Sequence, residues 1–124
     1  MRHLTLALLL LPMCACMSSP AKIVESAPVL SVTSAKQPEQ MEQCLRRELL
    51  NASWGICATL PRLESLPMDG GVDLVIIGQA PAAVISLRSE SGGSSARLYM
   101  APALHQPGCA DVRSRGDAAL TVCR

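Results

Sequence analysis

The chain has 124 residues, which is enough for one small domain and too short for an enzyme built from several domains. Apolar residues make up 49% of the sequence, but only Trp54 and Tyr99 are aromatic, so the core must be built from aliphatic side chains. Eleven basic and ten acidic residues give a net charge of +1, which argues against binding to nucleic acid through a basic surface.

A short apolar run follows a positively charged start. Arg2 and His3 precede the run Leu4–Leu11, and Pro12 ends it. A membrane span needs about 20 apolar residues, so this run is too short to cross a bilayer and has the length of a secretory signal. We therefore expect residues 1–15 to be a signal peptide.

The end of this signal contains two cysteines. Residues 13–16 read Met-Cys-Ala-Cys, and the first 17 residues resemble the signal of bacterial lipoproteins. In that family a small residue precedes a cysteine that is lipidated and becomes the new N-terminus. Ala15 fits that place before Cys16, whereas the bulky Met13 precedes Cys14. The resemblance therefore implies lipidation of Cys16, with Cys14 as the alternative.

The same resemblance implies a location. The family carries a diacylglyceryl group and a further acyl chain such as palmitate, and several acyl chains together make release from a membrane very slow. No aspartate follows Cys16, and in the family this favours the periplasmic face of the outer membrane. An ordinary signal cleaved near Ala15 or Ala21 is the alternative.

Residues 16–38 lack the pattern of a folded element. They mix serine, proline and alanine with scattered charges, and they show no sustained helical or strand period. We expect a flexible tether there, followed by one folded domain over residues 39–124. As an alternative, Ile23-Val24 and Val29-Leu30 would pack on the domain as a further strand.

The expected domain begins with a helix and continues with strands. Between residues 39 and 53, apolar side chains recur at spacings of three and four, at Met41, Cys44, Leu45, Leu49 and Ala52. Strand patterns separated by turn residues follow, at Val72–Gly78, Ala82–Arg88 and Ala96–Ala101. This order predicts an α+β fold with one N-terminal helix packed on a small three-stranded antiparallel sheet. Residues 117–123 fit a short C-terminal helix or an edge strand, and we favour the helix.

Side-chain alternation gives the predicted sheet two different faces. One face is apolar and is expected to pack on the helix; it carries Val72, Leu74, Ile76, Ala83, Ile85, Leu87, Leu98 and Met100. The other face is expected to be largely wet; it carries Asp73, Ser86, Arg88, Arg97 and Tyr99. Arginine and tyrosine are enriched at binding hot spots, so Arg88, Arg97 and Tyr99 form the candidate binding surface.

Four cysteines lie outside the signal: Cys44, Cys57, Cys109 and Cys123. An even number in a small exported domain indicates two disulfides, which suits a core that is poor in aromatic residues. Three pairings are possible. We favour the nested pairs Cys44–Cys123 and Cys57–Cys109, because they would tie the helix to the C-terminus and close both ends of the sheet.

The sequence offers no complete catalytic or metal-binding set. It contains no C-x-x-C and no G-x-S-x-G motif, and His105 is the only histidine after the signal. Pro107-Gly108 separates His105 from Cys109 and disrupts the helical spacing that a shared metal would need. We therefore expect no metal, no cofactor and no catalytic residue, and a protein that is not an enzyme.

These features predict a membrane-anchored lipoprotein whose small periplasmic domain binds another envelope protein. A second resemblance gives the alternative function. Residues 87–99 are similar to the Ser-Gly-Ala-Arg-Tyr loop of membrane-bound C-type lysozyme inhibitors, and residues 114–120 are similar to their Lys-Gly-acid-Ala segment. In that family a loop serine and a basic residue enter the lysozyme cleft. This resemblance implies a periplasmic inhibitor or immunity protein that blocks an enzyme such as a lysozyme.

Overall fold

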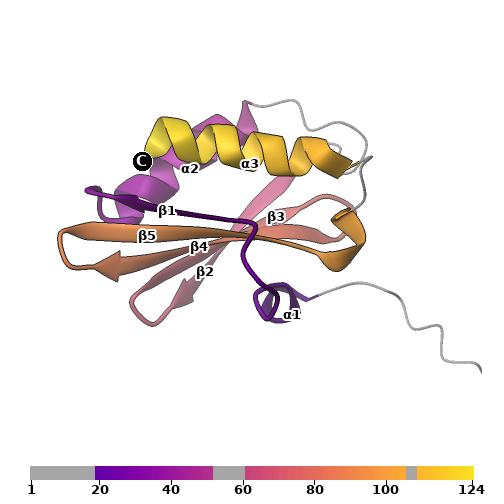
Figure 1. Ribbon diagram of the computed structural model, residues 1–124, viewed down its shortest axis with the longest axis horizontal. Helices are drawn as coiled ribbons and strands as arrows, with labels where there is room; N and C mark the ends of the chain where they lie inside the picture. The colour runs from indigo at the N-terminus through magenta and orange to yellow at the C-terminus, as the bar shows by residue number, and fades with distance from the viewer. Residues whose placement is uncertain (1–18, 52–60, 106–108) are drawn as a thin grey trace, which may run out of the picture.

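The computed structural model describes residues 19–51, 61–105 and 109–124, which form a layered α+β fold. Two long helices lie on one side of a sheet and a short helix lies on the other (Figure 1). The elements, in chain order, are α1 (Pro20–Ile23), β1 (Leu30–Ser34), α2 (Pro38–Leu50), β2 (Arg62–Met68), β3 (Gly71–Ile77), β4 (Pro81–Glu90), β5 (Gly93–Met100), the 3-10 helix η1 (Pro102–Leu104) and α3 (Ala110–Cys123). The five strands are antiparallel and lie in the order β1-β5-β4-β3-β2.

Helix α2 is the helix that the sequence predicted near residues 39–53. It begins at Pro38, whose fixed backbone angle suits the first helical turn. The backbone N–H of Gln37 donates to Oε1 of Gln40 at 3.1 Å, which satisfies a group at the helix start. Met41, Leu45 and Leu49 are buried, so the predicted apolar stripe is the side that packs in the core.

The three predicted strands form the centre of the sheet, as β3, β4 and β5. The turns before β3 and β5 contain Gly70, with a φ of 76°, and Gly92, with a φ of 83°, which is backbone that glycine adopts most easily. The predicted apolar face of these strands packs with side chains of α2 and α3 in the main core. The expectation for this face is therefore confirmed.

The sheet has five strands, so the predicted three-stranded sheet is wrong. Both missed strands are edges: β1 pairs with β5, and β2 pairs with β3. β2 contains Pro67, which an edge strand tolerates because one side of its backbone has no strand partner. β1 has only five residues, and β2 mixes apolar and charged residues around Pro67, so neither segment shows a clear strand pattern.

The expected flexible tether over residues 16–38 is wrong for the part that the structure describes. From Ser19 onward the chain is folded into α1, β1 and the first residue of α2. Ile23 is fully buried, and Leu30 and Val32 pack against the main core. The alternative, in which residues 23–24 and 29–30 pack on the domain, lies closer to the structure.

Helix α3 begins at Ala110, well before the segment 117–123 that the sequence favoured. Gly116 lies within it and is a packing residue. A Cβ added at Gly116 would lie 2.6 Å from Cδ2 of Leu98, which is closer than carbon atoms approach. The missing side chain therefore lets α3 approach the sheet at β5.

A disulfide joins the two long helices. Cys44 of α2 and Cys123 of α3 form the predicted bond, with their Cα atoms 5.7 Å apart. Nζ of Lys36 also donates to the carbonyl oxygen of Cys123. Where the sequence predicted two disulfides, the described residues show this one; Cys57, half of the other predicted pair, lies outside them.

Candidate functional site

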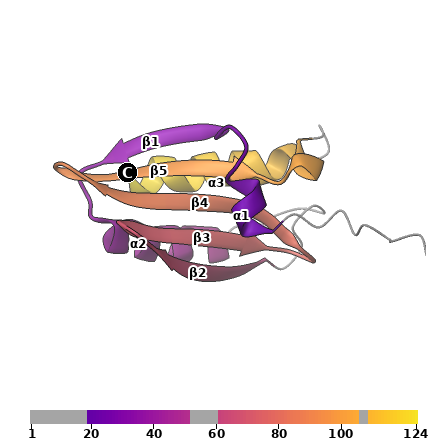
Figure 2. The ribbon, with the colours of Figure 1, turned by 90° about the horizontal axis from the view of Figure 1, so that it is seen from below.

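The two faces of the sheet are covered unequally. Helices α2 and α3 lie across one face, whereas α1, a helix of four residues, covers part of the other (Figure 2). We call this second face, which carries Asp73, Ser86 and Arg97, the open face. It is the face that the sequence assigned to the candidate binding surface.

The end of the open face beneath α1 is apolar. Ile23 of α1 packs in a small buried cluster with Val75, Val84, Tyr99 and Ala101. Tyr99 is only 9% exposed, so the prediction of a largely wet face is wrong at this end. The sequence signal was the pair Val75 and Val84, which alternate onto the same face as Tyr99.

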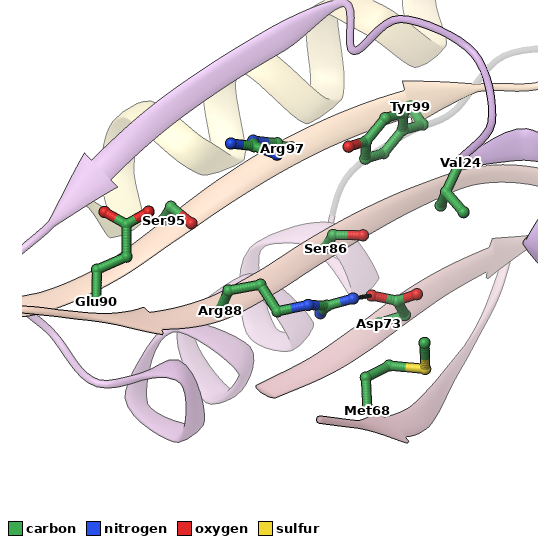
Figure 3. A pocket seen from close by; sticks show the side chains of 9 residues that line it. All are labelled: Val24, Met68, Asp73, Ser86, Arg88, Glu90, Ser95, Arg97 and Tyr99. Carbon is green, nitrogen blue, oxygen red and sulfur yellow. Dashed lines mark ion pairs between the residues drawn. The ribbon is translucent and has the colours of Figure 1, made fainter. Parts of the chain in front are cut away.

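Beyond α1 the open face is polar and hollowed. A hollow of about 370 Å³ is lined by Val24, Met68, Asp73, Ser86, Arg88, Glu90, Ser95, Arg97 and Tyr99 (Figure 3). The strand register explains part of this lining, because Arg97 pairs with Ser86 and Ser86 pairs with Asp73. These three residues form one row across β5, β4 and β3. The hollow thus brings together all five side chains that the sequence placed on this face.

Asp73 and Arg88 form an ion pair on the floor of the hollow. Asp73 is 5% exposed, so the expectation that it is wet is also wrong. Its Oδ1 lies 2.8 Å from Nη2 of Arg88, but no hydrogen bond to this oxygen is aligned within the described residues. The pair is therefore an ionic contact, and it offsets the cost of burying a carboxylate.

Arg88 is held by the fold and does not project from it. Its Nη1 donates to the carbonyl oxygens of Leu87, at 2.9 Å, and Val72, at 3.3 Å. The guanidinium of Arg88 is therefore occupied by its ion pair with Asp73 and its hydrogen bonds to the strand backbone. Of the three residues predicted to bind a partner, Arg88 and Tyr99 have structural roles.

Within the part of the chain that the structure describes, Arg97 and Glu90 are the charged side chains lining this hollow that form no ion pair. Both are exposed, and the ion pairs seen in the described parts of the chain involve neither of them. They also line a second hollow of about 320 Å³, next to β1, together with Ser95. Arg124, which is also exposed, lines the second hollow with them. Among the described residues, the two adjoining hollows thus carry one acidic side chain, Glu90, and two basic ones, Arg97 and Arg124, that no ion pair engages.

The Gly/Ser segment between β4 and β5 is a tight turn. β4 ends at Glu90 and β5 begins at Gly93, so the residues that resemble the lysozyme-inhibitor loop lie mostly in paired strands. Ser94 is buried, and its Oγ donates to the carbonyl oxygen of Lys36 at 2.7 Å. This serine therefore holds β5 to the segment after β1.

The other residues singled out from the sequence lie away from the hollow or outside the described residues. Cys14, Cys16 and Cys57 belong to the second group, while Cys109 is buried just before α3. Within the described ranges, no three histidine, cysteine or acidic residues are grouped as metal ligands. Nor is any helix in those ranges long and apolar enough to cross a membrane.

Comparisons of this chain with protein families, with curated proteins and with solved structures find no match. The role of the hollow must therefore be argued from its own geometry and charge.

Proposed function

We propose that this chain is a membrane-anchored bacterial lipoprotein whose small periplasmic domain binds an acidic group of another envelope component in the hollow of the open face. The proposed anchor rests on the signal-like residues 1–15 and on Cys16, with Cys14 as the alternative. The observation that supports the binding role is Arg97, an exposed arginine beside the hollow that forms no ion pair with any described residue.

Arg97 is well placed to hold an acidic group. It lies on β5, which is paired on both sides, so its backbone is fixed before a ligand arrives. Asp73 already forms an ion pair with Arg88, so the carboxylate of Asp73 does not neutralise the charge of Arg97. Ser86 and Ser95 add hydroxyl groups to the lining of the hollow. A guanidinium binds carboxylate or phosphate oxygens through two parallel hydrogen bonds.

The proposed role is binding without catalysis. Ser86 and Ser95 line the hollow, but no histidine, lysine or cysteine among the described residues lines it with them. A serine nucleophile needs a neighbouring base, and the carboxylate of Asp73 is engaged by Arg88. The component that the sequence favours as partner is another envelope protein, and a lysozyme-like enzyme is the alternative.

The anchor is tested by labelling with radioactive palmitate. We expect label in the wild-type protein and none in Cys16→Ser, because the thiol that carries the acyl groups is then missing. Label that persists in Cys16→Ser and disappears in Cys14→Ser would move the anchor to Cys14. The absence of label in the wild type would refute the lipoprotein proposal.

The binding role is tested by crosslinking in intact envelopes. A photoreactive residue at Ser31 places the probe on β1, directly opposite Arg97. We expect Arg97→Ala to abolish the crosslink, whereas Arg113→Ala, an exposed arginine on α3, should leave it unchanged. Equal crosslinking in both variants would refute a role for the hollow. Recovery of a lysozyme-like enzyme would favour the inhibitor function.

A further inference from the structure

We infer that the open face is turned toward the membrane that carries the anchor, and that its hollow takes a zwitterionic phospholipid headgroup. This inference rests on the proposed lipid anchor and identifies the acidic group as a lipid phosphate.

A short stretch of chain separates the proposed anchor from the fold. Only Met17 and Ser18 separate Cys16 from Ser19, the first residue that the structure describes. An extended chain spans at most about 3.6 Å per residue, so Ser19 lies within about 11 Å of the lipid-bearing residue. If Cys14 carries the lipid, the limit rises to about 18 Å.

This connection enters the fold at the start of α1. The hydroxyl of Ser19 accepts a hydrogen bond from the backbone N–H of Lys22 at 3.3 Å, at the start of α1. Ile23 at the end of α1 is fully buried against the open face. The chain therefore arrives on the side of the sheet that faces away from α2 and α3 (Figure 1). A helix is about 10 Å across, so a short connection brings the open face closer to the membrane than the two long helices.

The hollow carries side chains of both charges. Within the described residues, Arg97 and Glu90 have no ion-pair partner and line both adjoining hollows, and Arg124 adds a second cation to the lining of the hollow next to β1. A ligand with only an anionic group would pair with Arg97, but its negative charge would lie beside the negative charge of Glu90. A phosphoethanolamine headgroup carries a phosphate for Arg97 and an ammonium for Glu90, so it satisfies both charges. The phosphate of a membrane lipid is also the acidic group that the short connection brings nearest.

The competing orientation places the helices against the membrane. Leu50 of α2 and Val122 of α3 are large apolar residues that are exposed on that side of the molecule. A bilayer contact through them would leave the hollow facing away from the lipid. The two orientations therefore predict opposite distances between the same side chains and the membrane surface.

Spin labels on the lipidated protein distinguish the orientations. The protein is reconstituted in vesicles of phosphatidylethanolamine and phosphatidylglycerol that contain a nickel-chelating lipid. A nitroxide is placed at Thr33 or Glu64, exposed positions on the open face, or at Gln43 or Thr121, exposed positions on α2 and α3. We expect the nickel to relax the first two labels severalfold more strongly. Equal relaxation, or stronger relaxation at Gln43 and Thr121, would overturn the orientation.

A photoactivatable phosphatidylethanolamine in the same vesicles tests the headgroup. We expect Arg97→Ala and Glu90→Ala each to lower its crosslinking about fivefold, the effect of one charged contact at a membrane surface. Arg113→Ala should leave the yield unchanged. Wild-type yields in Arg97→Ala would overturn the headgroup site.

A lipid-headgroup site and a protein-binding site in this hollow give different crosslinks. A protein that is labelled by palmitate and crosslinks to a discrete envelope protein through Ser31 in an Arg97-dependent way would refute the headgroup and keep the binding role. A wild-type protein that takes up no palmitate would refute both.

Discussion

Removing the disulfide between α2 and α3 should destabilise the domain strongly. Cys44 and Cys123 are 79 residues apart, so their bond closes a long loop in the unfolded chain. The entropy of closing a loop of that length corresponds to about 4.5 kcal/mol of stability at room temperature. Small domains have total unfolding free energies of about 5–15 kcal/mol, so this bond carries a large share.

The measurement is urea unfolding of the chain from Ser19 onward, followed by circular dichroism. For a domain of this size the free energy of unfolding falls by about 1–2 kcal/mol per molar urea, so the double variant Cys44→Ala/Cys123→Ala should unfold about 3 M earlier. Thr121→Ala, an exposed change on the same helix, is the control and should stay within about 0.5 kcal/mol of the wild type. A loss below about 1 kcal/mol in the double variant would refute the loop-closure argument.

Two further changes test the packing and the hollow. Gly116→Ala should lower the free energy of unfolding by about 1–2 kcal/mol, because the new Cβ would collide with Leu98. This loss is expected even though alanine favours helices more than glycine does. An increase in melting temperature would show that α3 can move away from the sheet at no cost. Arg88→Met should destabilise the domain by about 2–4 kcal/mol because it leaves the buried Asp73 without its cation, and adding Asp73→Asn should recover most of that loss in urea unfolding. Additive losses in the double variant would mean that the ion pair contributes nothing.

The centre of the fold was predictable from the sequence because its patterns are long and regular. β3, β4 and β5 carry apolar residues at every second position between glycine-containing turns, and α2 has a clear helical stripe. The edge strands were not predictable in the same way. β1 has five residues and β2 contains Pro67, so each depends on pairing with a neighbouring strand that no local pattern reveals.

The candidate site was predicted in part. Alternation placed Arg88, Arg97 and Tyr99 on one face correctly, and all three line the hollow. Their separate roles depend on tertiary contacts: α1 folds back over Tyr99, and Arg88 turns toward Asp73. Only the tertiary environment shows that Arg88 is engaged by Asp73 whereas the guanidinium of Arg97 is available to a ligand.

The disulfide also divides the chain according to how it would respond to a mechanical pull at its N-terminus. β2, β3, β4 and β5 all lie between Cys44 and Cys123 and are therefore enclosed in a covalent ring, whereas α1 and β1 precede it. A pulling force would strip α1 and β1 from the sheet, unwind the start of α2 and then reach Cys44, where the bond stops further extension. The ring would keep its four strands together while the leading segment yields, so a domain pulled away from its surface could refold by returning only that segment.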